Sequence, residues 1–354
     1  MERNITVLVA PLDWGLGHAT RCIPVIRDLL SRKVKVIICA AGTGKIILAN
    51  YFPDCTFIEI PGISVNYPSS GSMSLSMLRQ FFKILKAIRK ENGLLQAVIE
   101  KYKITHIISD NRYGLYSKKI KCSVICHQVK IQLPSGFKFL QPLIYNLHIN
   151  RLQKFQQLWI PDNPYPDNLS GLLSHPITLK IPVMYTGILS RFKELLTVKN
   201  KVYDYLAILS GPEPQRTLLE LKVLEFFKSS GKKCLMVGGA PGEYISHETD
   251  LVTTMSYITD EILNQILHMD TTLICRPGYS TLMDLTVLGH RKIIFIPTPG
   301  QTEQEYLGME LELKYNYTVI SQYEKIPDTI HSGKPLSSHL LNPYLQETIR
   351  QFLE

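Results

Sequence analysis

Residues 271–284 read TTLICRPGYSTLMD, an apolar run followed by a proline–glycine turn and the polar first turn of a helix. The apolar run predicts a buried strand near 271–275. The glycine lets the chain turn tightly into the helix, whose first N–H groups have no acceptor within the helix and therefore favour anions. The stretch predicts a strand, an anion-binding turn and a helix in succession, the unit from which parallel sheets are built.

The same alternation of short apolar runs and longer amphipathic stretches extends in both directions from this stretch. Further strands are expected near 5–10, 34–39, 104–109, 122–126, 204–209, 233–237, 292–296 and 316–320. The runs are rich in β-branched residues, and the first is followed by an expected helix at 18–30. Alternating strands and helices predict an α/β fold with two doubly wound, Rossmann-like domains and a cleft between them.

A polar, Pro/Gly-rich region at 161–203 separates two groups of strands. With 354 residues, the chain is long enough for two domains that each bury their own core. We therefore predict an N-terminal domain over 1–188 and a C-terminal domain over 189–338. A last helix within 339–354 is expected to dock back on the first domain.

Composition excludes several classes of protein. Apolar residues make up 45% of the chain and charged residues 19%, which argues against a disordered or fibrous chain. The seven cysteines include no C-x-x-C pair, so we expect free thiols and no metal site. A net charge of +9 favours an acidic partner, yet the basic residues are scattered and no nucleic-acid motif is present, so nucleic acid is not expected.

The localisation is predicted from the N-terminus and from the length of the apolar runs. The sequence has no uninterrupted apolar run of about 18 residues and no signal-peptide core, which predicts a cytoplasmic protein. Residues 74–95 form a basic amphipathic stretch that could rest peripherally on the inner face of an anionic membrane. Such a stretch more often packs its apolar side on a sheet, with its lysines in solvent.

The loop after the strand at 5–10 contains Gly15, Gly17 and His18. The glycines allow a tight turn and place His18 at the start of the next helix. A histidine there suits a general base that takes a proton from a hydroxyl, because it ionises near neutral pH. The position also suits a histidine that only caps or packs the helix, and the loop alone does not decide between the two.

Two arginines follow predicted strands in the second half of the chain. Arg216 shares a loop with Ser210 and Gly211, and Arg276 begins the turn after the strand at 271–275. An arginine in such a place can contact a diphosphate through two parallel hydrogen bonds. An arginine that is merely solvated in a first helical turn is an equally good interpretation of Arg216.

The helix that begins near 278 has a first turn suited to phosphate. It opens with Gly278, Tyr279, Ser280 and Thr281, which bring backbone N–H groups and hydroxyls to the helix end. One turn later, Asp284 is placed to accept hydrogen bonds from a ribose. The alternative role of an acid in a first turn is to offset the helix dipole.

The helix after the strand at 292–296 begins with amides and carboxylates, among them Gln304 and Glu305. Such groups can hold the hydroxyls of a sugar. In isolation, an ordinary well-capped helix is the more common interpretation of this pattern.

Taken in order, these loops resemble those of the nucleotide-sugar glycosyltransferases of the GT-B fold. The likeness is greatest to glycosyltransferase family 28, with its bacterial transferase that adds N-acetylglucosamine to the lipid-linked peptidoglycan precursor, and to the related plant galactolipid synthases. It spans nearly the whole chain and is most specific between 257 and 306. The matching motifs are Tyr257-Ile258-Thr259-Asp260, Arg276-x-Gly278-x-x-Thr281-x-x-Asp284, Pro297 and Gln304-Glu305-Tyr306.

The resemblance implies a UDP-sugar site in the second domain. The main chain at Ile258, beside Tyr257, would read the uracil edge, and the helix start at 278–281 would hold the diphosphate. Asp284 would bind the ribose, and the loop 210–216 would close over the phosphates.

The resemblance also implies where the sugar and the acceptor bind. Gln304 and Glu305 would hold the donor sugar, but the family commonly has Gln-Gln at this place, so the identity of the sugar stays open. His18 aligns with a histidine of the family's cleft. Residues 110–112 and 127–128 are candidates for the acceptor side of the first domain.

The implied activity is inverting, metal-independent transfer of a hexose or N-acetylhexosamine from a UDP-sugar to a hydroxyl of a glycan or lipid-linked acceptor, without a cofactor. His18 would take the hydroxyl proton. The helix end at 278, with Arg216 or Arg276, would meet the charge on the leaving diphosphate. Two alternatives stay open: a UDP-sugar 2-epimerase and a noncatalytic nucleotide-sugar-binding protein.

Overall fold

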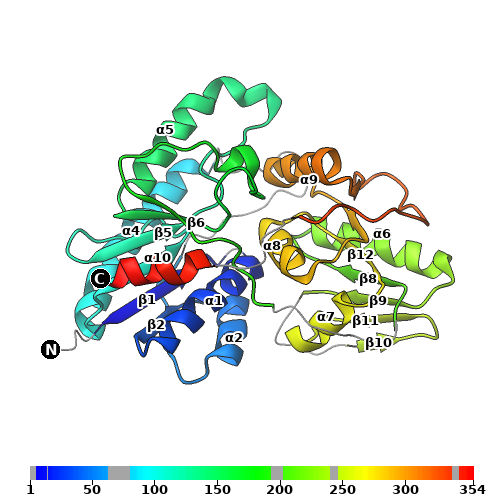
Figure 1. Cartoon of the computed structure of the whole chain (residues 1–354), viewed down its shortest axis with the longest axis horizontal. Coiled ribbons are helices and arrows are strands. Elements are labelled where there is room, and N and C mark those ends of the chain that lie inside the picture. The colour runs from blue at the N-terminus through cyan, green and yellow to red at the C-terminus, as the bar shows by residue number, and fades with distance from the viewer. Residues whose placement is uncertain (1–4, 14, 63–79, 193–201, 240–245, 337–342) are drawn as a thin grey trace. The chain divides into compact units, whose positions relative to one another are not determined.

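The computed structural model describes residues 5–13, 15–62, 80–192, 202–239, 246–336 and 343–354 (Figure 1). These residues divide into two compact units. The first unit contains the described residues of 1–65, 77–191 and 339–354, and the second contains those of 192–338.

The first unit is built on a seven-stranded sheet with the order β3-β2-β1-β4-β5-β6-β7. Each strand runs parallel to its neighbours. The strands are β1 (Thr6–Pro11), β2 (Lys35–Cys39), β3 (Thr56–Ile58), β4 (His106–Asp110), β5 (Lys121–Ile125), β6 (Gln157–Ile160) and β7 (Val183–Tyr185). The helices are α1 (Leu16–Ser31), α2 (Gly42–Tyr51), α4 (Phe81–Tyr102), α5 (Gln141–Leu152) and α10 (Pro343–Leu353), with short 3-10 helices η1 (Ser135–Leu140) and η2 (Gly171–Leu173).

The second unit repeats this plan, with the order β10-β11-β9-β8-β12-β13-β14. β10 pairs antiparallel with β11, and the other pairings are parallel. The strands are β8 (Tyr205–Ile208), β9 (Cys234–Val237), β10 (Ser246–Glu248), β11 (Val252–Met255), β12 (Thr272–Cys275), β13 (Ile293–Phe295) and β14 (Thr318–Val319). The helices are α6 (Gln215–Ser230), α7 (Asp260–Leu267), α8 (Tyr279–Leu288) and α9 (Thr302–Tyr315).

The central strands β1 and β4 of the first sheet are buried along their whole length, because helices cover both faces of a parallel sheet. In β1, Val7, Leu8 and Val9 are completely buried, and so are Ile293 and Ile294 of β13. Each unit has its own hydrophobic core around its sheet. The prediction of two α/β domains with parallel sheets is therefore confirmed.

α10 belongs to the first unit although it follows the second unit in sequence. Its Phe352 packs edge-on against His106 of β4 and Trp159 of β6, with ring centroids 5.2 Å apart in both pairs. Ile349 of the same helix is completely buried. In Figure 1 this helix is drawn in red beside the blue and cyan elements of the first unit.

α4 covers the C-terminal part of the basic amphipathic stretch, and residues 74–79 lie outside the described residues. The apolar side chains Ile88 and Leu95 are buried, whereas Lys86 and Lys90 are exposed. This is the arrangement of a helix that packs on its sheet. Within the described part of the chain, none of the helices has both the length and the apolar content that crossing a membrane requires.

Candidate functional site

In the first unit, the site lies at the carboxyl ends of β1 and β4. These strands are neighbours in the sheet, and Pro11 at the end of β1 pairs with Asp110 at the end of β4. The chain adds β2 and β3 on one side of β1 and then returns to place β4 on the other side. Ligands of open α/β sheets bind at such a reversal, beyond the carboxyl ends of the strands.

His18 lies in the first turn of α1, directly after this reversal. The helix is preceded by Gly15 at φ 130°, a backbone conformation that residues with a side chain rarely adopt. Gly17 accepts a hydrogen bond from the Thr20 hydroxyl at 3.2 Å, within the same turn. The two predicted glycines therefore form the start of the helix that carries His18.

His18 faces the carboxylate of Asp110. The His18 Nδ1 atom is 3.2 Å from Asp110 Oδ1, and the His18 side chain is 19% exposed while that of Asp110 is fully buried. Burial lowers the pKa of His18, against the opposite effect of Asp110. Burial would raise the pKa of Asp110, but the Arg21 guanidinium and His18 outweigh it and hold this pKa at about 2. At neutral pH the site therefore contains a neutral imidazole next to a carboxylate.

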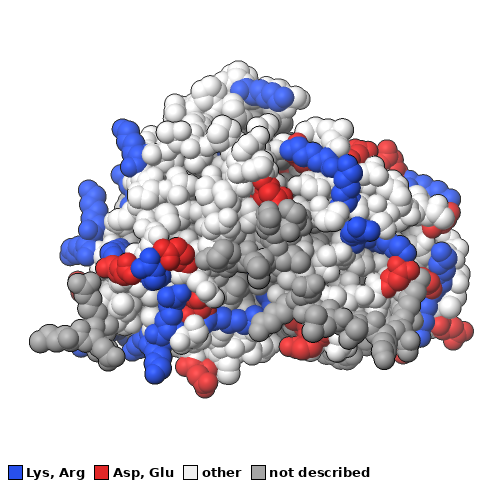
Figure 2. Space-filling view, in the orientation of Figure 1, with Lys and Arg blue, Asp and Glu red and all other residues white. Residues whose placement is uncertain are grey.

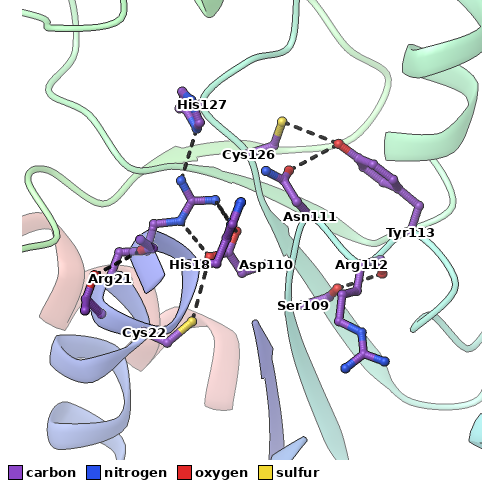
Figure 3. A network of polar contacts seen from close by, with 12 residues as sticks. His18, Arg21, Cys22, Ser109, Asp110, Asn111, Arg112, Tyr113, Cys126 and His127 are labelled. Carbon is purple, nitrogen blue, oxygen red and sulfur yellow. Dashed lines mark hydrogen bonds and ion pairs between the residues drawn. The ribbon is translucent and has the colours of Figure 1, made fainter. Parts of the chain in front are cut away.

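Arg21 completes this cluster and was not predicted as a site residue. Its guanidinium is buried, and its Nε donates to Asp110 Oδ2 at 2.6 Å while its Nη2 donates to Oδ1. Figure 3 shows the guanidinium among His18, Asp110 and His127. The Nη2 atom is 2.9 Å from His18 Nδ1, and Nη1 is 3.1 Å from His127 Nδ1. The sequence gives one indication of the contact between Arg21 and His18: the two residues are three positions apart on one helix, and side chains with this spacing are neighbours.

The other candidates on the acceptor side have structural partners. Arg112 is buried, pairs with Glu91 at 2.6 Å and donates to the carbonyl of Ile60 at 2.7 Å. Asn111 directly follows β4 at φ 54°, and its side-chain amide is hydrogen-bonded to the Tyr113 hydroxyl at 3.1 Å (Figure 3). These residues hold the loop after β4 in place, so that Asp110 can face α1.

In the second unit, the corresponding reversal lies between β8 and β12, where Ile208 pairs with Cys275. Gly278 precedes α8 in an extended conformation, and none of the described side chains caps this helix. Tyr279 is buried, while Ser280, Thr281 and Asp284 are half-buried on the first two turns. The N-terminal end of α8 therefore lies where a phosphate would be expected.

Arg276 follows β12 and has its hydrogen-bond partners within the second unit. Its side chain is completely buried, and burial lowers its pKa to about 10. It donates to the carbonyls of Ile296 and Pro297 at 2.9 Å, to that of Gln215 at 3.0 Å and to Gln322 Oε1 at 2.5 Å. These contacts hold loops of the second unit together, and a contact of Arg276 with a diphosphate stays a prediction.

Arg216 also has partners within its own unit. It pairs with Glu213 at 2.8 Å and donates to the carbonyl of Gly238 at 3.1 Å, and 30% of its side chain is exposed. This arrangement agrees with the alternative interpretation of an arginine in a first helical turn. Its guanidinium could reach a diphosphate only by exchanging these partners.

Gln304 and Glu305 fix the turn at the start of α9. Gln304 is buried, and its Oε1 accepts from the N–H of Thr298 at 2.8 Å. Glu305 Oε1 accepts from the N–H of Gly300 at 2.8 Å. Both contacts tie the turn before α9 to the first turn of the helix, although no described side chain caps the helix itself. That Gln304 and Glu305 hold a donor sugar stays a prediction.

Two polar atoms of this turn have no partner among the described residues. Thr298 Oγ1 and Gln301 Oε1 are both buried and lack a hydrogen bond. A Cβ placed on Gly211, which is at φ 109°, would lie 3.8 Å from Thr298 Oγ1, so the loop after β8 borders this hydroxyl. Buried polar groups without partners are rare in proteins, and a bound ligand is one reason for them. Neither residue was predicted as a site residue, because a Pro/Gly turn gives no sign of burial in the sequence.

Tyr257 and Ile258 lie between β11 and α7. The Ile258 side chain is buried in the second unit, and Thr259 caps α7 by accepting from the N–H of Ile262 at 3.4 Å. The main chain at Ile258 thus follows the carboxyl end of β11, on the sheet that carries the α8 helix start.

A comparison with protein-family models finds no match, and no curated protein sequence matches the chain. Solved structures do match. The glycotransferase of kitacinnamycin has a TM-score of 0.59 and 13% identity over 98% of this chain and 93% of its own. The spinosyn rhamnosyltransferase SpnG complexed with thymidine diphosphate has a TM-score of 0.57 and 12% identity over 99% and 92%.

A plant enzyme matches over much of its length as well. UGT89C1 of Arabidopsis thaliana complexed with UDP-L-rhamnose has a TM-score of 0.57 and 13% identity over 91% of this chain and 86% of its own. At such low identity, these matches establish the arrangement of strands and helices and not a narrower family. The chain therefore has the two-domain GT-B fold of these solved glycosyltransferases.

Proposed function

We propose that this chain is a glycosyltransferase that moves a sugar from a UDP-sugar to an acceptor hydroxyl, with inversion at the anomeric carbon and without a metal. The observation that carries the proposal is the His18–Asp110 pair at the strand reversal of the first sheet. Two proteins of similar fold were solved with UDP-L-rhamnose and thymidine diphosphate, which supports a nucleotide sugar as donor.

The pair has the composition of a general base with its orienting carboxylate. His18 is neutral at neutral pH, so its ring can take a proton from an acceptor hydroxyl. The hydroxyl oxygen then forms a bond to the anomeric carbon while the bond to the diphosphate breaks, and UDP leaves with that electron pair. Asp110, ionised and buried, stabilises the imidazolium that forms.

The donor is assigned to the second unit. The N-terminal end of α8 offers N–H groups and the helix dipole to the diphosphate, whose charge grows as the sugar leaves. Thr298 Oγ1 and Gln301 Oε1 offer hydrogen-bonding groups that lack partners within the described chain. Arg276 and the pair Gln304–Glu305 support the loops that form this site, and we assign them no direct contact.

The decisive experiment compares His18→Ala with His247→Ala, a control at an exposed residue of β10. UDP release and product formation are measured with a panel of UDP-sugars and acceptors, and UDP affinity is measured by calorimetry. Loss of the base should lower kcat by about 100-fold or more and leave UDP affinity unchanged. Equal losses in both would remove His18 from the base role.

The same assay separates the alternatives. An epimerised UDP-sugar formed without acceptor and without free UDP would identify an epimerase. Tight UDP binding with neither transfer nor donor hydrolysis would identify a binding protein.

An anionic membrane is proposed as a further partner, at a different place from the one the sequence indicated. The apolar residues of α4 that the structure describes pack inward, whereas η1 and α5 expose Phe139, Leu143 and Leu147 by 75%, 55% and 37%. Leu143 and Leu147 are four residues apart and share one side of α5, and Phe139 lies in η1, which directly precedes this helix. We call them, with Lys138 and Arg151 at the two ends, the α5 surface.

Charge supports the choice of an anionic membrane for the α5 surface. No Asp or Glu occurs between Asp110 and Asp162 in the sequence. This segment carries Arg112, Lys118, Lys119, Lys121, Lys130, Lys138, Arg151 and Lys154. Figure 2 shows white and blue but no red over α5 on the face in view. Exposed apolar side chains flanked by basic ones are typical of helices that lie in a membrane interface.

A further inference from the structure

The Nδ1 atom of His18 has two neighbours with opposite requirements. Asp110 Oδ1 lies 3.2 Å away and, as an ionised carboxylate, can only accept a hydrogen bond. Arg21 Nη2 lies 2.9 Å away and can only donate. One ring nitrogen cannot donate to the first and accept from the second at the same time. The neutral ring therefore has two competing states.

The two states differ in the chemistry of the opposite nitrogen. When the proton is on Nδ1, it bonds to Asp110 and leaves a lone pair on Nε2, which can act as a base. When the proton is on Nε2, Nδ1 accepts from Arg21, and Nε2 can donate but cannot take a proton. Only the first state suits proton removal from an acceptor hydroxyl.

Arg21 is held in this competing position by three contacts. Its Nε and Nη2 atoms fork onto the two oxygens of Asp110, and its Nη1 donates to His127 Nδ1 at 3.1 Å. Its side chain is only 1% exposed, so it cannot simply turn into solvent. The carboxylate that would orient His18 is thus already occupied by a guanidinium from the same helix.

The charged groups around His18 come from four elements of the first unit. Arg21 lies on α1, Asp110 ends β4, His127 follows β5 and Asp13 follows β1. Arg21 is the nearest permanent cation to the ring, and Asp110 is the nearest anion. A protonated His18 would place two positive charges side by side on one carboxylate.

We propose that Arg21 is a positioning residue for the base: it competes with His18 for Asp110 and thereby determines whether Nε2 of His18 carries a lone pair or a proton. The proposal rests on the proposed function in assigning His18 as the base. The His18 imidazole is then a weaker base than in a His–Asp pair without an arginine, and it stays unprotonated at acidic pH.

The test compares wild type with Arg21→Met, Arg21→Lys and the control Arg32→Met, which removes an exposed arginine at the end of the same helix. In 15N-histidine protein, the shifts of His18 Nδ1 and Nε2 report the tautomer directly, and their titration reports the pKa of the ring. Neither measurement depends on turnover. The pH profile of kcat/KM for transfer is recorded in parallel.

Removing the guanidinium takes away a like charge and frees Asp110, so the pKa of His18 should rise by about one unit or more. A base with a higher pKa is protonated at a higher pH, so the acidic limb of kcat/KM should move to higher pH by the same amount. The Nδ1–H state should gain population. Arg21→Lys keeps the charge but loses the fork, so it should move both readouts in the same direction by less.

Arg21→Lys also protects the test against misfolding, because its ammonium can still pair with the buried carboxylate if Arg21→Met does not fold. Unchanged tautomer shifts and an unchanged acidic limb in a folded variant would overturn the proposal, as would a shift to lower pH. If the tautomer changes as expected but wild type transfers no sugar, the role of Arg21 stands and the transferase assignment fails.

Discussion

Asp110 is a carboxylate that the fold removes from water and keeps ionised. It is fully buried, and Arg21 with His18 holds its pKa at about 2, below the ordinary value of 3.8. A carboxyl whose pKa is lower in the folded state stabilises the fold at pH values above its ordinary pKa. That contribution is lost as the pH falls through the folded-state value.

The first prediction concerns acid stability. Wild type should lose about 2 kcal/mol of unfolding free energy from this group between about pH 4 and pH 2. Asp110→Asn should be less stable at neutral pH, because Arg21 loses its charged partner, but its stability should fall less steeply in that window. Urea unfolding at a series of pH values measures both. Glu100→Gln, a change at an exposed residue of α4, is the control and should keep the wild-type slope.

A second prediction follows from the Thr298 hydroxyl, which is buried and has no partner among the described residues. Thr298→Val should leave the melting temperature of the free protein unchanged or higher, because no hydrogen bond is lost. UDP-sugar affinity should fall by about threefold to tenfold if the ligand bonds to this hydroxyl. Thr271→Val should instead lower the melting temperature and leave UDP-sugar affinity unchanged, since the Thr271 hydroxyl donates to the carbonyl of Tyr203 at 2.8 Å. Unchanged affinity in Thr298→Val would place the donor elsewhere.

Residue types in the loops predicted some of these positions and not others. A histidine at a glycine-opened helix start was enough to select His18. Its contact with Asp110, which lies 92 residues further along the sequence, depends on β1 and β4 becoming neighbours, and no local pattern encodes that pairing. The sequence was less informative at Arg276. An arginine directly after a strand gives the same pattern whether its guanidinium faces a phosphate or, as here, backbone carbonyls.

At the scale of elements, apolar patterning located the central strands well. The predicted strand at 5–10 is β1 and that at 271–275 is β12, each within one residue. β3, β6, β7, β10 and β11 were not predicted. They are three or four residues long, and β10, Ser-His-Glu, is exposed throughout, so burial imposed no apolar pattern on it. Its place at the edge of the sheet comes from pairing with β11.

The third prediction concerns the α5 surface. Phe139→Gln combined with Leu143→Gln should weaken cosedimentation with vesicles containing anionic phosphatidylserine by about tenfold or more, since two exposed apolar side chains no longer insert. Binding should also fall with added salt. The matched control is Leu218→Gln combined with Leu221→Gln, two exposed leucines of α6. Equal binding by wild type and both double variants would remove the membrane from the proposal.

For the molecule as a whole, two sheets with separate cores are expected to respond to a ligand separately. Nucleotide binding should stabilise the unit that contains the site, whereas the other unit gains nothing by direct contact. Among the described residues, no group of three or more His, Cys, Asp and Glu side chains is arranged to hold a metal ion, and independence from metals remains a prediction.

The fourth prediction therefore joins hydrogen exchange with a metal test. UDP at about a hundred times its dissociation constant should stabilise the second unit by about 2.7 kcal/mol and slow exchange in β8, β12 and α8. Strands β1 and β4 should not change. Transfer should continue at the same rate after treatment with EDTA. Protection confined to the first unit would contradict the assignment of the donor to the second unit. Activity that is restored only by added Mg²⁺ would contradict the metal-free mechanism.

The C-terminal helix has a consequence for how the protein is made. Ile349 and Phe352 fill the core of the first unit, yet a ribosome synthesises them only after the entire second unit. Part of the apolar surface of the first sheet therefore stays exposed while the second unit is synthesised and folds. Nascent chains stalled before residue 343 should consequently recruit chaperones through the N-terminal half, the half that was translated first.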